Sequence, residues 1–334
     1  MTTPAQILHD VFGYTSFRSG QEEIIDLILS GENVLAVMPT GSGKSLCYQI
    51  PALILEKPTI VVSPLMALMD DQVAGLRADG VEAASIHSGM GRDVQIAQWR
   101  KVTAGKARLL YLAPERLMME NMLSALHRLD PHLFVIDEAH CISKWGPSFR
   151  PEYEQLSRLK ELFPDARIAA FTATADKATR ADIAQKLFAG AGRTIVHGFD
   201  RPNLRLGVAH KTHWSKQLLA FLADKKGQSG IVYCLSRKFT EEVASFLQEQ
   251  GWNAIPYHAG QESETRKRNQ DRFMSENEAV MTATIAFGKG IDKPDIRYVC
   301  HLNLPASMEA YYQEIGRAGR DGAGEEAMLV YGYD

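Results

Sequence analysis

The strongest structural signal in the sequence is Met38-Pro39-Thr40-Gly41-Ser42-Gly43-Lys44-Ser45. This stretch lies between an apolar run at residues 33–37 and a helical pattern at residues 46–50. Its two glycines let the backbone curl so that successive N–H groups point at one polyphosphate, and the helix that follows adds positive potential there. The sequence therefore predicts a buried strand, a phosphate-binding loop and a helix, in that order.

The residues of this loop have expected roles with a bound nucleotide. Lys44 should reach the β- and γ-phosphates, and Ser45 should bind magnesium. Met38 occupies the position at which the strict pattern has a glycine, so the match also depends on the strand and helix on either side. The loop residues expected to surround the phosphates are Thr40, Gly41, Ser42 and Gly43.

Length and composition are those of an ordinary two-domain protein. With 334 residues the chain exceeds one typical core, and we expect domains at residues 1–200 and 201–334. The net charge of -3 gives no overall attraction for nucleic acid, so any such binding must come from a local basic surface. No apolar run is long enough to span a bilayer and the first residues lack a secretion signal, so we expect a cytoplasmic protein without a membrane partner.

The four cysteines are Cys47, Cys141, Cys234 and Cys300, which lie far apart in the sequence. They form no C-x-x-C pair, which argues against a zinc ribbon and against a disulfide framework. We therefore expect buried free thiols and no zinc in this chain.

An acidic pair follows a second apolar strand pattern. Leu133-Phe134-Val135-Ile136 comes directly before Asp137 and Glu138, and ligands in open α/β sheets bind at the carboxyl ends of the strands. We expect Asp137 to hold the magnesium of the nucleotide and Glu138 to orient or deprotonate the attacking water. An exposed acidic loop would be the alternative, but it does not account for the apolar strand before the pair or for the phosphate loop upstream.

Residues 141–151 contain aromatic side chains at neither helical nor strand spacing, which predicts a loop. Trp145 and Phe149, with Lys144 and Arg150 interleaved, are a plausible platform for stacking bases and neutralising phosphates. The same spacing suits aromatic side chains that pin the loop to the core. The sequence alone leaves both interpretations open.

Two weaker signals lie on either side of these motifs. Tyr14 and Gln21 come just before the phosphate loop, where they could stack on an adenine and hydrogen-bond its edge. A further strand pattern at residues 168–171 ends in Thr172 and Thr174, small hydroxyl residues suited to relaying contact from the nucleotide site.

A turn-rich segment at residues 198–203 is expected to link two α/β domains with parallel sheets, because strand and helix patterns alternate on both sides of it. We find no sequence repeat, and the second half has no phosphate loop of its own. Arg317 and Arg320 lie three residues apart and can project from one face of a helix. They are either surface charge at a helix end or arginine fingers that complete the active site.

Taken together, these motifs resemble those of the RecQ family of superfamily 2 DNA helicases. The resemblance covers essentially the whole chain and is carried by the phosphate loop, residues 12–21, the 137–140 motif, the aromatic loop, Ala286-Phe287-Gly288 and residues 313–322. It implies two RecA-like parallel-sheet domains with the nucleotide site in the cleft between them. It also implies ATP-driven movement on single-stranded DNA and 3′ to 5′ unwinding of tailed or forked duplexes in recombination and repair.

The resemblance also implies residue roles. Tyr14, Arg18 and Gln21 would bind the adenine, and His140 with the aromatic loop would couple DNA to ATP hydrolysis. The other positions expected to contact DNA or to take part in coupling are Thr172, Thr174, His258 and Thr284. The protein is expected to act as a monomer in the cytoplasm, associated with the nucleoid.

The sequence departs from the family pattern at a few positions. Pro147 and Ser148 replace a usual histidine and aspartate of the aromatic loop, and Lys289 replaces a common methionine. Many members continue into a zinc-binding module and a winged helix, whereas this sequence ends at Asp334 without a cysteine cluster. Two alternative functions therefore stay open, an ATP-gated single-strand-binding protein with little unwinding and an RNA helicase.

Overall fold

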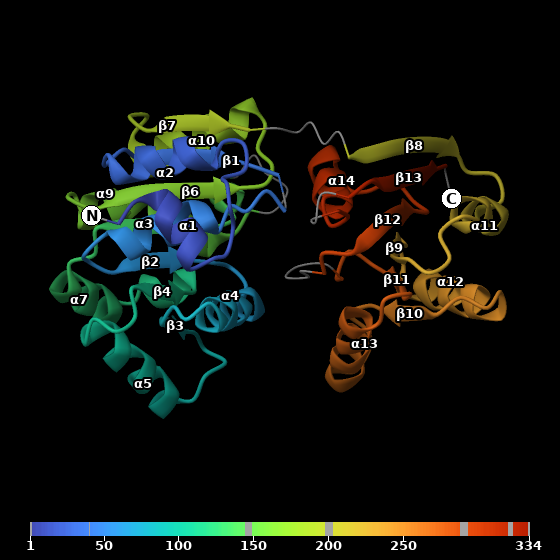
Figure 1. The fold of residues 1–334 in the computed structure, drawn as a ribbon, viewed down its shortest axis with the longest axis horizontal. Helices are drawn as coiled ribbons and strands as arrows, with labels where there is room; N and C mark the ends of the chain where they lie inside the picture. The colour runs from blue at the N-terminus through green and yellow to red at the C-terminus, as the bar shows by residue number, and fades with distance from the viewer. Residues whose placement is uncertain are drawn as a thin grey trace. The chain divides into compact units, whose positions relative to one another are not determined.

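The computed structural model describes residues 2–39, 41–143, 149–197, 203–287, 293–319 and 323–332. The chain divides into two compact units, Met1–Phe199 and Asp200–Asp334, which we call the first and the second lobe. Figure 1 shows a sheet in each unit. Each lobe is described by itself below.

The first lobe is built on a sheet of seven parallel strands in the order β3-β4-β2-β5-β6-β1-β7. Six of the strands are short apolar runs that are buried along their whole length or nearly so, as expected for a parallel sheet covered on both faces. The strands are β1 (Val34–Val37), β2 (Thr59–Val62), β3 (Ala83–Ile86), β4 (Leu109–Leu112), β5 (Leu133–Ile136), β6 (Arg167–Thr172) and β7 (Arg193–Val196).

Helices cover both faces of this sheet, and each face has its own apolar core. Val34 and Ala36 of β1 pack in one core, and Leu35 and Val37 pack in the other, because successive side chains of a strand point to opposite faces. The helices of the Val34 face are α1 (Pro4–Asp10), α2 (Gln21–Leu29), α3 (Leu46–Ile54) and α4 (Met66–Ala78). Helices of the other face include α5 (Arg92–Thr103), α7 (Glu120–Leu129) and α10 (Lys177–Phe188).

Shorter helical turns connect these elements. The turns are α6 (Pro114–Leu117), the 3-10 helix η1 (Ala139–Ile142), α8 (Pro151–Glu154), the 3-10 helix η2 (Gln155–Arg158) and α9 (Leu159–Leu162). The turn η1 matters most for function because it begins directly after the acidic pair.

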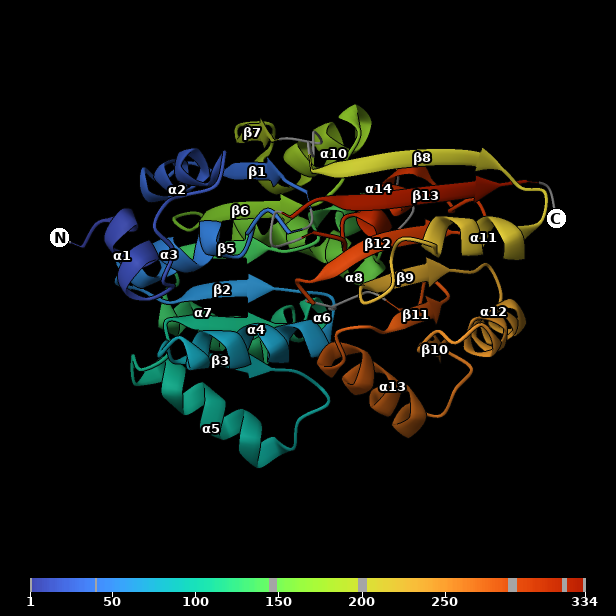
Figure 2. The same ribbon diagram turned by 45° about the vertical axis from the view of Figure 1, so that its right-hand side comes forward.

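The second lobe repeats the architecture with a sheet of six parallel strands in the order β10-β11-β9-β12-β13-β8. Figure 2, turned by 45°, shows β8 and β13 side by side along this sheet. The strands are β8 (Leu204–His210), β9 (Ser229–Tyr233), β10 (Ala254–Tyr257), β11 (Val280–Ala283), β12 (Ile296–His301) and β13 (Glu325–Tyr331).

Two pairs of helices enclose the second sheet. One core contains side chains of α11 (Trp214–Leu222) and α12 (Arg237–Glu249), and the opposite core contains side chains of α13 (Ser263–Ser275) and α14 (Met308–Ile315). Both lobes are therefore α/β layers around a parallel sheet, as the sequence predicted. All four cysteines are free and buried, which confirms the expectation for the thiols.

Candidate functional site

The phosphate loop leaves the carboxyl end of β1 and runs into α3. Gly41 and Gly43 both have left-handed backbone angles, with φ of 81° and 79°, which glycine adopts without steric cost. The amino group of Lys44 donates to the carbonyl oxygens of Met38 (3.2 Å) and Pro39 (3.3 Å), so the lysine lies folded against the start of the loop. Thr40 lies outside the described residues.

Arg18, which precedes α2, and Gln21, its first residue, hold the phosphate loop from the side. The buried amide of Gln21 donates to the carbonyls of Ser42 (3.2 Å) and Gly43 (3.1 Å), and its oxygen accepts from the backbone N–H of Arg18 (2.8 Å). The Arg18 guanidinium donates to the carbonyl of Gly41. Both residues expected at the adenine therefore also fix the conformation of the loop that would hold the phosphates.

Gly43 has a second reason to be glycine. A Cβ at this position would lie 2.4 Å from the amide nitrogen of Gln21. Any side chain here would displace the Gln21 amide, in addition to being strained at positive φ. Tyr14, the third residue expected at the adenine, is 51% exposed and leaves its ring open for stacking.

The acidic pair lies at the carboxyl end of β5. The N–H of Asp137 donates to the carbonyl of Val62 on the neighbouring strand β2 (2.9 Å), and the hydroxyl of Tyr153 donates to the carbonyl of Asp137 (2.9 Å). Glu138 has the left-handed backbone angles φ 50° and ψ 44° immediately before η1. The backbone N–H of Glu138 donates to the carboxylate of Asp137 (2.9 Å).

Charge and burial act strongly on the first carboxylate. The pKa of Asp137 is raised from 3.8 to about 7, chiefly by burial and next by the charge of Glu138, while Lys44 lowers it. A carboxyl whose pKa is raised by burial is suited to bind a cation, because the cation compensates the negative charge of the ionised form. Ser45, which begins α3 as its N-cap, supplies the hydroxyl expected as a second ligand.

Close contacts through His140 connect the acidic pair to the end of β6. Nδ1 of His140 lies 2.9 Å from the hydroxyl of Thr172 and 3.3 Å from Oε2 of Glu138. The Thr172 hydroxyl donates to the carbonyl of Thr174 (3.0 Å), so we assign the remaining proton to Nδ1 of the histidine. The ring thus donates to Thr172, while Oε2 of Glu138 lies close to the same nitrogen without a hydrogen bond.

These contacts join the ends of the neighbouring strands β5 and β6, and β1, which leads into the phosphate loop, lies on the other side of β6. Oε2 of Glu138 is buried and accepts no hydrogen bond from the described residues, beyond its ionic contact with His140. A buried carboxylate oxygen without a hydrogen bond can accept one from a water molecule, such as the water that would attack a bound phosphate. The residues present therefore fit a magnesium nucleotide with a water held by Glu138.

The aromatic loop is anchored at both ends, although residues 144–148, including Trp145, Pro147 and Ser148, lie outside the described residues. At its start, the amino group of Lys186 on α10 donates to the carbonyl of Ile142 (2.9 Å). At its end, the N–H of Arg150 donates to Cys141 (2.9 Å) and its guanidinium to Pro64 (3.1 Å). Phe149, next to this end, is half-buried.

In the second lobe, Arg317 follows α14 directly, while Arg320 and Lys289 lie outside the described residues. The Nε of Arg317 is buried and has no hydrogen-bond partner among the described residues. Beneath this turn, Nε2 of His301 lies 2.7 Å from the carboxylate of Glu314, and both side chains are buried. The N–H of Gly319 donates to the carbonyl of Ile296 (3.0 Å), which ties the arginine-bearing turn to β12.

The other two positions expected from the family pattern lie in turns after strands. The hydroxyl of Thr284, after β11, accepts from the N–H of Ala286 (3.4 Å). His258, after β10, is 8% exposed, and both of its ring nitrogens are hydrogen-bonded. The burial of these two side chains does not by itself indicate that either one contacts a ligand directly.

Comparison with known proteins agrees with this arrangement. The family model described as DEAD/DEAH box helicase matches residues 18–183, and the one described as helicase conserved C-terminal domain matches residues 210–322. The chain is 41% identical over 334 residues to "Probable ATP-dependent DNA helicase RecS" of Bacillus subtilis, covering 99% of this chain and 67% of the relative. The chain belongs to the RecQ family of helicases. It is 48% identical over 329 residues to "ATP-dependent DNA helicase RecQ" of Pasteurella multocida, covering 98% of this chain and 52% of that protein.

This RecQ-family chain thus spans about half the length of the first curated relatives it matches. Among solved structures, the DUF1998 helicase MrfA bound to DNA matches with a TM-score of 0.77 and 18% identity, covering 99% of this chain and 48% of that one. Mycobacterium smegmatis helicase Lhr matches with a TM-score of 0.70 and 22% identity, covering 96% and 46%. At such identities the likeness shows the fold alone, which is that of RecA-like helicase lobes.

Sequence reasoning missed several residues of the RecQ-family site. Lys186, Tyr153 and His301 belong to no local motif, because each contacts residues distant in the sequence, and the contact of His301 with Glu314 of the 313–322 motif was not expected. In the described part of the chain, no cluster of three or more His, Cys, Asp or Glu side chains could hold a metal ion. No described helix is long and apolar enough to cross a membrane.

Proposed function

We propose that the chain is the motor of a RecQ-type DNA helicase, which hydrolyses ATP to move 3′ to 5′ on single-stranded DNA and to separate tailed or forked duplexes. The observation that supports this most is the connection from Glu138, which lies 3.3 Å from His140, through the hydrogen bonds of His140 with Thr172 and of Thr172 with Thr174. It links the residue that would act on water to a strand end outside the phosphate loop. A nucleotide-binding protein with no second ligand would not need such a connection.

In the proposed reaction, the loop residues bind and orient the nucleotide. Lys44 would leave the carbonyls of Met38 and Pro39 to pair with the phosphates, and Ser45 and Asp137 would hold a magnesium ion. A metal held there would supply positive charge to the phosphates during hydrolysis. Binding a cation also favours the ionised form of Asp137, whose pKa is raised in its absence.

Glu138 is the residue proposed to act on the attacking water. Its Oε2, which is buried and has no hydrogen bond from the described residues, would accept the water proton. Nδ1 of His140 lies 3.3 Å from that oxygen, and the ring is proposed to keep the carboxylate in place. Any displacement of the ring would move the base, so the ring is the point at which DNA can control hydrolysis.

The aromatic loop is proposed to be the DNA sensor. It follows His140 by a few residues, and Lys186 and Arg150 hold its two ends against the first lobe. Bases that stack on Trp145 and Phe149 would pull on the segment that carries His140. Thr284 would contribute from the second lobe to contact with the strand, and Arg317 and Arg320 are proposed to stabilise charge on the transferred phosphoryl group.

We propose further that the chain acts as a monomer in the cytoplasm, at the nucleoid.

One relative, of Acanthamoeba polyphaga mimivirus, carries a name that describes an RNA helicase and is 38% identical over 331 residues. The aromatic loop favours DNA as the strand bound by this chain, because its side chains suit stacked bases of a single strand without readout of a 2′-hydroxyl.

The test combines ATPase and strand-displacement assays. ATP hydrolysis should be stimulated by single-stranded DNA more than by RNA of the same sequence, and a 3′-tailed duplex should be separated in preference to a 5′-tailed one. The Glu138→Gln variant serves as the inactive control. Strand-stimulated hydrolysis without any separation would favour the ATP-gated binding protein, and stronger stimulation by RNA would favour an RNA helicase.

A further inference from the structure

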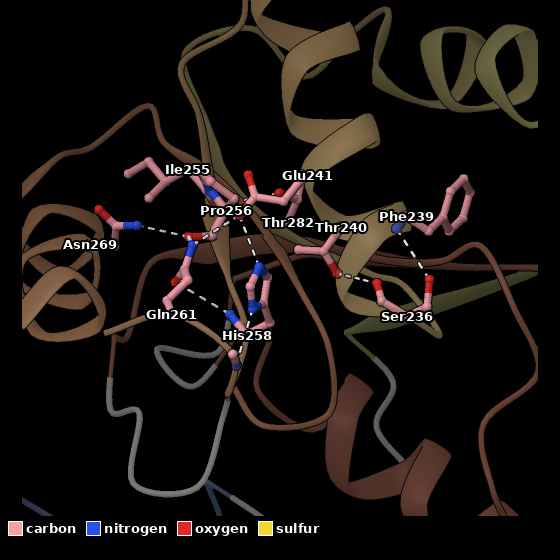
Figure 3. Close-up of polar contacts among 11 residues, drawn as sticks. Ser236, Phe239, Thr240, Glu241, Ile255, Pro256, His258, Gln261, Asn269 and Thr282 are labelled. Atoms are coloured by element: carbon pink, nitrogen blue, oxygen red, sulfur yellow. Dashed lines mark hydrogen bonds and ion pairs between the residues drawn. The ribbon is translucent and has the colours of Figure 1, made fainter. Parts of the chain in front are cut away.

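A histidine after the edge strand of the second lobe holds the following loop in place (Figure 3). Nε2 of His258 lies 2.9 Å from the carboxylate of Glu241 on α12, and Nδ1 lies 3.2 Å from the N–H of Gly260. Gln261 adds bonds from its amide to Glu241 (3.3 Å) and to the carbonyl of Pro256 (3.1 Å). The ring therefore joins a helix, a strand end and a loop.

The first lobe contains the same arrangement. Nε2 of His87, which follows β3, lies 3.0 and 3.1 Å from the two carboxylate oxygens of Asp70 on α4. The N–H of Gly89 donates to Nδ1 of this ring (3.2 Å). Ser85 adds a hydroxyl hydrogen bond to Asp70 (3.0 Å). The distances from the ring to the carboxylate and to the glycine N–H are close to those of the second lobe, whereas the contact of Ser85 has no counterpart there.

The two arrangements occupy equivalent places in the two folds. In each, the carboxylate precedes the ring by 17 residues and the glycine follows it by two. Both strands, β3 and β10, lie at the edge of their sheet, and each is separated from the strand before its helix by one other strand. The helices after the loops, α5 and α13, begin at the same spacing from the ring.

The protonation of both rings follows from these contacts. A backbone N–H can only donate, so Nδ1 of each ring must accept and the ring proton lies on Nε2, directed at the carboxylate. Each ring is thus a neutral bridge with one acceptor and one donor. The interaction requires an oxygen acceptor on the helix but does not require its negative charge.

Each bridge supports an exposed loop tip made of small residues. His87 and His258 are buried, whereas the two residues after each ring, Ser88 with Gly89 and Ala259 with Gly260, are exposed. Small residues let another molecule approach the backbone closely. A Cβ at Gly260 would lie 2.9 Å from the side chain of Arg237, so a cationic side chain lies beside this tip.

The position of the loops indicates what they hold. In the first lobe, the phosphate loop, Asp137 and Thr172 use the carboxyl ends of β1, β5 and β6. The loop after β3 also follows the carboxyl end of its strand. However, β3 is the outermost strand on the far side of the sheet, beyond β2 and β4. Since ligands of such sheets bind at the carboxyl ends of strands, that end remains for a second ligand.

We propose that His87 and His258 are equivalent positioning residues, each holding one loop in the conformation that grips the backbone of the single strand. This inference rests on the proposed function, adds His87 to it, and gives His258, already expected near the DNA, a positioning role. The rings do not touch the strand. They act through the backbone of the two exposed tips, and each lobe contributes one grip.

The experiment measures the concentration of single-stranded DNA that gives half-maximal ATPase stimulation. His87→Phe and His258→Phe keep a ring of similar volume but remove both hydrogen bonds. Each should raise this concentration roughly tenfold, the effect of losing one or two neutral hydrogen bonds, and the double variant roughly a hundredfold, because distant sites add. The rate at saturating DNA should stay within about twofold of the wild type, since only the grip is weakened.

Conservative variants separate positioning from general stability. Glu241→Gln and Asp70→Asn keep an oxygen acceptor and should retain the DNA dependence of the wild type. His258→Asn keeps the acceptor for Gly260 and His258→Gln keeps the donor for Glu241, so both should give intermediate effects and serve where a Phe variant does not fold. His9→Phe removes an exposed histidine that pairs with Asp10 at 2.8 Å and is the matched control.

Hydrogen exchange of the Gly89 and Gly260 amides gives an independent measure of the bridges. Exchange of each amide should be faster in the corresponding Phe variant. If DNA stimulates the wild type and the folded Phe variants show the same DNA dependence, this inference is overturned and the proposed function is not. A wild-type chain that no strand stimulates overturns the proposed function, and the strand role of both rings with it.

Discussion

His140 donates from Nδ1 to the hydroxyl of Thr172 over 2.9 Å, and that hydroxyl in turn donates a hydrogen bond to the carbonyl of Thr174. The end of β6 is therefore connected to the residue that orients Glu138. Because all members of this chain are buried, a change at one member alters the hydrogen bonds of the next.

Replacing Thr172 by valine should uncouple hydrolysis from DNA. Thr172→Val keeps the shape but removes the hydroxyl that accepts from Nδ1 of His140, and we expect DNA stimulation to fall roughly tenfold. Thr59→Val is the matched control, because the Thr59 hydroxyl is buried without a hydrogen-bond partner among the described residues. DNA-stimulated ATPase measured on both decides the matter, and equal behaviour of the two variants would contradict the role of Thr172.

Lys44 and Glu138 should separate nucleotide binding from hydrolysis. Lys44→Ala removes a phosphate contact and should lose both ATP affinity and turnover. Glu138→Gln removes only the group that acts on water and should still bind ATP while turnover is abolished. Equilibrium binding of a fluorescent ATP analogue, measured beside ATPase activity, tests this. The assigned roles are wrong if both variants lose ATP affinity to the same extent.

Arg320, outside the described residues, should act on turnover and not on nucleotide binding. We expect Arg320→Ala to lower DNA-stimulated hydrolysis roughly 10³-fold or more, the range in which arginine fingers operate. The control is Arg272→Ala, which removes an exposed arginine paired with Glu276 at 2.8 Å and should leave turnover near that of the wild type. Near-normal turnover in Arg320→Ala would return this residue to surface charge.

Asp137→Asn should stabilise the nucleotide-free protein at high pH. The folded-state pKa of Asp137, about 7, lies above the ordinary value of 3.8, so ionisation costs stability as the pH rises between these values. An asparagine does not ionise, and its advantage should grow from pH 4 to pH 7 and then stay constant, reaching a few kcal/mol. Thermal unfolding from pH 5 to pH 8 measures it. An advantage that shrinks with rising pH would contradict the direction of the shift.

Trp145 is the residue for which two interpretations remain. If it stacks on bases, Trp145→Ala should keep the melting temperature and lose DNA stimulation, since each stack contributes roughly 1 to 3 kcal/mol. If it packs into the first lobe, the cavity should cost about 3 to 5 kcal/mol and lower the melting temperature. Thermal unfolding and ATPase with and without DNA separate the two. Normal melting together with full stimulation would contradict both.

The strands that the sequence predicted are those made of β-branched and large apolar residues. Thr59–Val62, Leu109–Leu112 and Leu133–Ile136 agree with the structure residue by residue. The edge strand Ala83–Ile86 was missed because two alanines and a serine have little strand propensity. Strand Leu204–His210 was missed because it lies at a sheet edge and has no buried apolar run, with Leu206 and Val208 exposed.

The candidate site shows the same division. Lys44, Asp137 and Glu138 follow from sequence because phosphate and metal binding need these side chains at fixed places in a local motif. Lys186 could not be predicted, since its contact with Ile142 spans 44 residues. The pairs of His87 and His258 with their carboxylates escaped notice because only three residues of each arrangement are shared, and no stretch of sequence around them repeats.

The left-handed backbone of Glu138 has a consequence for directed evolution of this protein. A residue with a side chain in this conformation costs roughly 1 kcal/mol or more, and a glycine would adopt it freely. Glycine would also remove the negative charge that destabilises ionised Asp137. Selection for heat resistance alone should therefore favour Glu138→Gly, and libraries screened without an activity step will collect inactive proteins at this position.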